Sequence, residues 1–350
     1  MPSGVRVRFV DNGNGLSMHV LEAGGPGRPC VLLLHGFPEL AYSWRKIMAP
    51  LADAGFYVVA PDQRGYGRTT GWSADYDGDV DSFRLANLVR DVEGLLRALG
   101  LDSVASVVGH DFGAPVAAYC ARTRPEVFRS LVLMSAPFSY VSATDIGAEL
   151  AALARPRKHY QWYYSTPKAN EDMWHCAQGV HAFLRAYYHM KSADWPGNKP
   201  FRLASWSATE LAKMPPYYIM ERDKTMAETV APAMPASAAA WLSESELAVY
   251  SAEYALTGFQ GGLQWYRCRT EGRNGDLVAL AGRAIDVPSM FIAGASDWGV
   301  YQVPGAFEQM QESVLARMRG CHLVDGAGHW VQQERPEEVK RLLLEFLAQA

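Results

Sequence analysis

Short runs of apolar residues alternate, toward both ends of the chain, with stretches whose apolar positions recur at helical spacing. Runs typical of strands buried on both faces of a parallel sheet lie at 30–34, 57–60, 104–108, 130–134, 289–293 and 322–324. The stretch 83–99 carries one stripe of leucine and valine and ends at Gly100, as an amphipathic helix does. Further helices are expected at 41–54, 112–122, 304–318 and 336–347. A strand–turn–strand pattern at 5–22 adds a hairpin. This alternation predicts an α/β fold, with a mostly parallel central sheet flanked by helices.

The middle of the chain interrupts this alternation. From about Pro137 to about Arg283 no clear buried strand occurs, and the segment is rich in tyrosine, tryptophan and methionine. We therefore predict a core domain of residues 1–137 and 284–350, with an inserted helical lid domain of residues 138–283. The two junctions of such an insertion should lie close together.

Composition and charge narrow the classes of function. The 350 residues carry a formal net charge of −4 and no lysine–arginine block, which argues against a nucleic acid or a membrane surface as partner. Five scattered cysteines without CxxC spacing indicate reduced thiols and a reducing compartment. No signal-peptide core and no apolar stretch of about 18 residues is found. We therefore expect a cytoplasmic protein; the sequence does not distinguish a monomer from a homodimer.

The segment Gly-His-Asp-Phe-Gly at 109–113 follows a predicted buried strand and runs directly into a predicted helix. This order is typical of a nucleophile elbow, a sharp turn that presents one side chain above the sheet. The turn is cramped, which suits Gly109 and Gly113. The central residue is Asp111, and Gly-x-Ser-x-Gly occurs nowhere in the chain. An aspartate here could be a simple helix N-cap, but the glycine frame favours a nucleophile.

Two further residues complete a catalytic triad. Asp297 and His329 each follow a predicted strand, and they come after Asp111 in the order nucleophile, acid, histidine. The ends of parallel strands are where open α/β sheets place their ligands. A third loop, His-Gly-Phe-Pro-Glu at 35–39, also follows a strand. It predicts an oxyanion hole made by the backbone N–H groups of Phe37 and Phe112.

These motifs, with Arg-Gly-Tyr-Gly at 64–67 and Gly-His-Trp at 328–330, resemble those of the α/β-hydrolase-fold epoxide hydrolases of the soluble type. The resemblance covers nearly the whole chain and implies the α/β-hydrolase fold with a lid. It departs from the family at Phe112, where tryptophan is common, and in a longer lid segment around 194–241. The mechanism that it implies uses side chains and water, so no cofactor and no metal is expected.

The resemblance also implies two catalytic tyrosines in the lid. The stretch 258–267 looks like the family segment that supplies one of them, at Tyr266. The stretch 160–164 looks like the segment that supplies the other. By position we assign Tyr160, with Tyr163 as the reserve choice.

This residue set suits the opening of an epoxide to a vicinal diol. A positioned carboxylate, Asp111, can attack carbon while phenols protonate the leaving oxygen. Water activated by His329, itself oriented by Asp297, would then hydrolyse the ester. The aromatic lid predicts a small apolar substrate, aromatic or bulky, with water as co-substrate. We expect the substrate pocket to include His35, Pro38, Trp162, Tyr163 and Trp330.

Rival functions share parts of this set. A haloalkane or haloacid dehalogenase would use the same nucleophile, but it needs N–H donors for a halide, and Phe112 offers no side-chain donor. A serine esterase lacks its motif here. A non-catalytic ligand receptor on the same scaffold would not require the complete triad and tyrosines, although fold alone does not decide function.

Overall fold

The computed structural model describes residues 3–139, 144–280 and 282–349. One eight-stranded sheet has the order β1-β2-β4-β3-β5-β6-β9-β10. Its strands are β1 (Val5–Asp11), β2 (Ser17–Ala23), β3 (Cys30–Leu34), β4 (Tyr57–Pro61), β5 (Ser106–His110), β6 (Leu131–Met134), β9 (Ile285–Gly294) and β10 (Leu315–Val324). The β1–β2 and β2–β4 pairs are antiparallel, and the other pairs are parallel. The predicted α/β architecture is confirmed.

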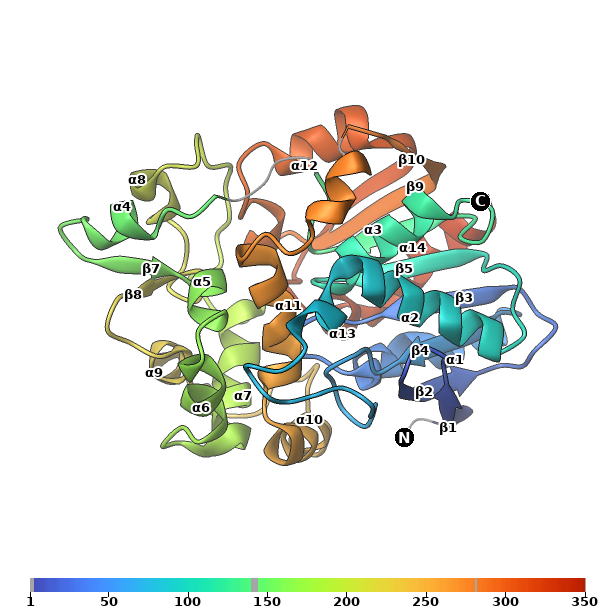
Figure 1. Cartoon of the computed structure of the whole chain (residues 1–350), viewed down its shortest axis with the longest axis horizontal. Coiled ribbons are helices and arrows are strands. Elements are labelled where there is room, and N and C mark those ends of the chain that lie inside the picture. The colour runs from blue at the N-terminus through green and yellow to red at the C-terminus, as the bar shows by residue number, and fades with distance from the viewer. Residues whose placement is uncertain (1–2, 140–143, 281, 350) are drawn as a thin grey trace.

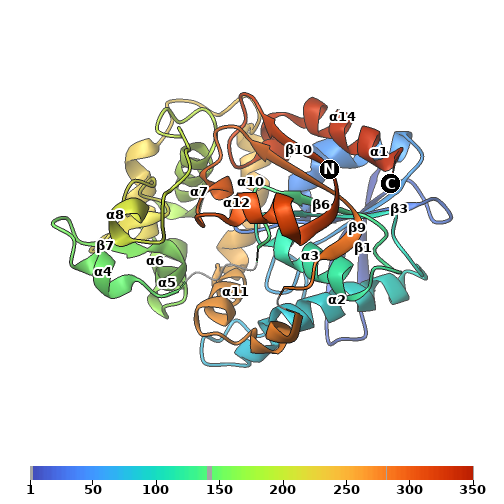
Figure 2. The same cartoon turned by 90° about the horizontal axis from the view of Figure 1, so that it is seen from above.

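Helices cover both faces of this sheet, as Figure 2 shows. On one face lie α1 (Arg45–Asp53) and α14 (Pro336–Leu347); on the other lie α2 (Leu85–Ala98) and α3 (Gly113–Thr123). Successive residues of a strand point to opposite faces. The side chains of β3 therefore pack into the hydrophobic cores on both faces of the sheet, so its apolar run is continuous rather than alternating.

The end of the chain differs from the expectation of a helix over 304–318. Helix α12 (Ala306–Gln309) is followed by one π-helical turn, Met310–Val314, and β10 begins at Leu315. Of this strand only the end, 322–324, was predicted, because β10 is an edge strand in which residues such as Arg317 face solvent. An edge strand with one pairing partner does not need a continuous apolar run.

Between β6 and β9 the chain leaves the sheet and returns to it as the neighbouring strand, with Leu131 opposite Ser289. We call residues 144–280 the lid segment. Its helices are α4 (Gly147–Ala151), α5 (Tyr160–Tyr164), α6 (Lys168–Trp174), α7 (Gly179–Lys191), α8 (Ala208–Leu211), α9 (Met226–Val230), α10 (Glu244–Thr257) and α11 (Gln260–Thr270). They form the lobe beside the sheet in Figure 1. The lobe also contains a two-stranded ribbon, β7 (Arg157–His159) and β8 (Ile219–Glu221), too short to leave a sequence signal.

The lid segment is bound tightly to the core. The buried guanidinium of Arg45 donates to Glu246 of α10 at 2.7 Å and to Gln333 of the core at 2.6 Å. Helix α11 approaches the loop after β4 so closely that a Cβ on Gly261 would lie 2.2 Å from the carbonyl oxygen of Gly65. Among the described residues, no helix is long and apolar enough to span a bilayer.

Candidate active site

Asp111 stands at a strained turn between β5 and α3. Its φ of 50° lies in the left-handed region that few non-glycine residues adopt. The glycines around it are required for space. A Cβ on Gly109 would lie 2.2 Å from the carbonyl oxygen of Gly113, and one on Gly113 would lie 2.4 Å from that of Leu34. The structure thus has the geometry of a nucleophile elbow at the predicted residue.

The Asp111 carboxylate is held from two sides. Its Oδ1 accepts a hydrogen bond from the Phe37 N–H at 3.0 Å, and its Oδ2 lies 3.3 Å from His329 Nε2. A Cβ on Gly36 would lie 2.4 Å from the Asp111 Cβ, so the loop after β3 can approach only as glycine. Burial alone would raise the pKa of Asp111, but the neighbouring His329 outweighs it and holds this pKa below its usual value. The carboxylate is therefore ionised at neutral pH.

His329 bridges the two aspartates. Its Nδ1 lies 3.1 Å from each carboxylate oxygen of Asp297, which is 2% exposed and also accepts the Gly299 N–H at 2.7 Å. Burial and the nearby Lys191 lower the pKa of His329, yet the two carboxylates raise it to about 9. The imidazole is therefore protonated in the resting site. Its Nε2 faces Asp111 Oδ2 at 3.3 Å, so the imidazolium lies between the two carboxylates.

A layer of buried polar groups lies beneath Asp111, His329 and Asp297. The His110 ring N–H donates to the carbonyl oxygen of His329 at 2.7 Å, and the hydroxyl of Ser135 donates to the same oxygen at 3.0 Å. The other ring nitrogen of His110, Nδ1, is hydrogen-bonded to the Glu39 carboxylate. The same carboxylate accepts the Gly36 N–H at 3.1 Å. Glu39 thus links the loop after β3 to the catalytic histidine. The sequence motif at 35–39 includes Glu39, but nothing in its spacing indicates that this side chain reaches His110.

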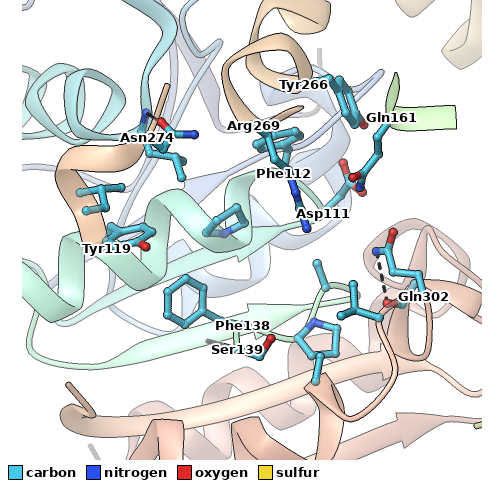
Figure 3. A pocket seen from close by; sticks show the side chains of 18 of the residues that line it. Asp111, Phe112, Tyr119, Phe138, Ser139, Gln161, Tyr266, Arg269, Asn274 and Gln302 are labelled. Atoms are coloured by element: carbon cyan, nitrogen blue, oxygen red, sulfur yellow. Dashed lines mark hydrogen bonds between the residues drawn. The ribbon is translucent and has the colours of Figure 1, made fainter. Parts of the chain in front are cut away.

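A cavity of about 380 Å³ opens above the nucleophile (Figure 3). Asp111 lines it together with Tyr160, at the start of α5, and Tyr266, on α11. The two tyrosine rings are 5.9 Å apart, centroid to centroid. The Tyr160 hydroxyl donates to Gln302 Oε1 at 3.1 Å and accepts from Gln161 Nε2 at 3.0 Å. The structure therefore brings Asp111, Tyr160 and Tyr266 to one cavity.

The long stretch of the lid at 194–241 packs against one of the cavity tyrosines. The carbonyl oxygen of Tyr218 accepts the backbone N–H of Tyr160 at 2.9 Å, and the rings of the two residues are 5.1 Å apart. On the other side, the ring of Phe112 packs edge-on against Tyr266, 4.9 Å away. Phe112 thus fills the space beside the nucleophile and supports one of the tyrosines.

The five residues expected in the substrate pocket are not among those that line the cavity. The Tyr163 hydroxyl turns away and donates to Asp172 at 2.9 Å. The Trp330 indole is fully buried and donates to the carbonyl oxygen of Tyr188. Of the remaining three, His35 and Pro38 lie in the loop after β3, and Trp162 lies in α5. Residues such as Phe138, Gln302 and Arg269 line the cavity instead.

Comparisons with known proteins agree with this geometry. A family model described as alpha/beta hydrolase fold matches residues 29–336. The chain is 36% identical to epoxide hydrolase A of Mycobacterium tuberculosis, over 97% of this chain and 96% of that protein. It is 32% identical to epoxide hydrolase 2 of Siraitia grosvenorii, over 95% and 96%. Among solved structures, an epoxide hydrolase from an endophytic Streptomyces superposes with a TM-score of 0.82 at 32% identity, covering 99% of this chain and 96% of that one. Potato epoxide hydrolase I superposes with a TM-score of 0.79 at 30% identity, covering 99% and 100%.

Proposed function

Since the chain belongs to the α/β-hydrolase fold family and is an epoxide hydrolase within it, we propose that Asp111 is its nucleophile and that the diol is released from an ester of this side chain. An epoxide and water are the two substrates. The observation that carries the proposal is the cavity itself, which Asp111 shares with two buried phenols. A carboxylate that attacks carbon and an acid that protonates oxygen are the two groups that epoxide opening needs.

In the first step, Asp111 Oδ2 forms a bond to an epoxide carbon while the carbon–oxygen bond of the ring breaks. The hydroxyls of Tyr160 and Tyr266 donate to the oxygen that leaves, and one of them transfers its proton. Burial raises the pKa of both phenols above the usual value, so both remain protonated at neutral pH. The Phe37 N–H keeps Oδ1 fixed and so directs Oδ2 toward the substrate.

In the second step, a water bound at His329 Nε2 attacks the carboxyl carbon of the ester. Its proton passes to His329, whose Nδ1 is held by Asp297. The negative charge develops on Asp111 Oδ1, 3.0 Å from the Phe37 N–H. We assign the Phe112 N–H as the second donor because the N–H after the nucleophile has this role in a nucleophile elbow. A preorganised donor of this kind contributes about 3–4 kcal/mol. Collapse of the tetrahedral intermediate expels the diol and regenerates the carboxylate.

The walls of the cavity support a bulky or aromatic substrate. Phe112, Tyr119, Phe138 and Leu277 supply apolar surface along it.

We further propose that residues 138–283 are the lid domain of the enzyme, because the chain leaves the sheet after β6 and rejoins it at β9. The five cysteines are all unpaired, which supports a reducing, cytoplasmic location.

The ester mechanism can be tested by a single turnover in ¹⁸O-water with a panel of aryl epoxides. The expected result is label in the peptide that contains Asp111 and unlabelled diol from the first turnover. Label that enters the diol directly would exclude Asp111 as the nucleophile. The variant Asp111→Asn provides the control, because it should form no ester while the cavity keeps its shape.

A further inference from the structure

A buried lysine lies beside the triad, and the two steps above do not use it. Lys191 is the last residue of α7, and only 4% of it is exposed. Its Nζ makes no hydrogen bond or ion pair with the described residues. Instead it faces a cage of four aromatic rings, with centroids at 5.3 to 5.9 Å: Tyr187, Tyr217, Tyr218 and Trp330. Rings at this distance attract an ammonium group through their π faces.

The charges that face Lys191 come from three loops of the core. Burial lowers its pKa, while the carboxylates of Asp111, Asp297 and Glu39 raise it. These carboxylates follow β5, β9 and β3 respectively, so the amine faces the acidic side of the site. Burial has the larger effect, so the pKa of Lys191 lies below its usual value; the three carboxylates and four π faces oppose this shift and stabilise the ammonium form.

Lys191 is also fixed mechanically to the catalytic histidine. Its carbonyl oxygen accepts the backbone N–H of His329 at 2.9 Å. Trp330, one of the rings that surround Nζ, follows His329 in sequence. The rings of Trp330 and His329 lie 4.7 Å apart, centroid to centroid. Asn198 holds the backbone on either side of Lys191 by donating to the carbonyl oxygens of Met190 and Ser192. The backbone of Lys191 is therefore held against the loop that carries His329.

The proposed cycle needs His329 in two protonation states. In the resting site it is an imidazolium between two carboxylates. When Asp111 becomes an ester, one of these negative charges is consumed, and the histidine must give up its proton before it can act as a base. The acceptor is the phenolate left when a tyrosine protonates the epoxide oxygen. In the second step the water proton returns to His329, and the acid proton of the released Asp111 passes to the diol, so the cycle closes.

We propose that Lys191 is a positioning residue for ester hydrolysis: its caged cation repels a proton on His329 once Asp111 has lost its charge, and so prepares the neutral base. The proposal rests on the ester mechanism above. Groups that face the His329 ring and loop are Asp111, Asp297, Lys191, His110 and Glu334. Within that set, Lys191 is the group that the lid contributes.

The test measures the rate of ester hydrolysis against pH in single turnovers of the full chain with an aryl epoxide. In Lys191→Met, the acid limb of this profile should shift upward by about one pH unit, with hydrolysis about 10-fold slower on its acid side. The effect should fall on hydrolysis rather than on ester formation. Lys191→Arg keeps a cation and should keep the limb near that of the parent protein. Asn198→Ala is the matched control: it loosens the same backbone without removing charge, so it should slow the reaction at every pH and leave the limb in place.

Three outcomes would overturn the proposal. One is a Lys191→Met profile with an unshifted limb. Another is a Lys191→Arg shift as large as that of Lys191→Met, which would indicate a packing role. The last is a shifted limb in Asn198→Ala. Thermal unfolding of each variant shows whether the fold is intact. Failure of the ester mechanism is recognised separately, because the parent protein would then form no labelled Asp111 ester.

Discussion

Removing the hydroxyl of either cavity tyrosine should slow the opening of the epoxide and leave hydrolysis of the ester as it is. In Tyr160→Phe the ring and its packing remain, but the donor held by Gln302 and Gln161 is lost. In Tyr266→Phe the edge-on contact with Phe112 remains. Each change therefore removes one donor to the oxygen that leaves and little else.

The size of the effect follows from the geometry of the site. One preorganised donor to a developing oxyanion contributes about 3–4 kcal/mol, and its loss slows a reaction by about 10²- to 10³-fold. Because Tyr160 and Tyr266 share one oxygen, the remaining phenol partly compensates, and each single variant should lose about 10²-fold in the rate of ester formation. The double variant should lose far more than either.

Tyr163→Phe is the matched control, one helical turn away on α5. Its hydroxyl donates to Asp172 at 2.9 Å and accepts the Met226 N–H at 3.4 Å, outside the cavity. Losing these bonds should lower the free energy of unfolding by about 1 kcal/mol and leave ester formation within about two-fold of the parent.

Stopped-flow single turnovers separate the two steps, because ester formation and ester hydrolysis appear as successive phases. Ester formation at the parent rate in Tyr160→Phe would refute the assignment of this residue. So would a loss in Tyr163→Phe comparable to that in Tyr160→Phe. Since burial raises the pKa of both cavity phenols, the rate of ester formation should also show no alkaline limb below about pH 10.

Three further variants test other parts of the site. His329→Gln should still form the ester but slow its hydrolysis by about 10³-fold, so that labelled ester accumulates and is seen by mass spectrometry. Gly261→Ala should push α11 away from the core loop and lower both kcat and the melting temperature, whereas Gly25→Ala, whose added Cβ meets nothing within 4 Å, should change neither. Arg45→Met removes the buried guanidinium that donates to Glu246 and Gln333 and should lower the free energy of unfolding in urea by about 2 kcal/mol.

The parts of the site that the sequence revealed are those built from local patterns. The elbow at Asp111 needs a buried strand, two glycines and a helix within a few residues, and all of these are visible in the chain. Asp297 and His329 follow apolar runs in an order that the resemblance made meaningful. In each case a short stretch both forms the turn and carries the reacting side chain.

What the sequence did not reveal depends on contacts between distant segments. Trp330 stands beside the catalytic histidine in the chain, yet its indole turns into the lid to reach Tyr188, away from the cavity. Gln302 enters the site only because α5 packs over the loop that follows β9. Lys191 becomes a buried cation only when the long lid segment brings Tyr217 and Tyr218 against it. The spacing of residues along the chain does not predict these contacts between distant segments.

The lid segment holds the loops of the proposed site in position and does not merely cover them. Tyr188 donates to the carbonyl oxygen of Pro38, and Tyr254 donates to that of Glu39, so the lid fixes the loop that supplies the Phe37 N–H. Lys191 holds the backbone of the histidine loop in the same way. Acids, oxyanion hole and base therefore all depend on contacts that cross from lid to core. A displacement of the lid large enough to open this interface would therefore also disassemble the site.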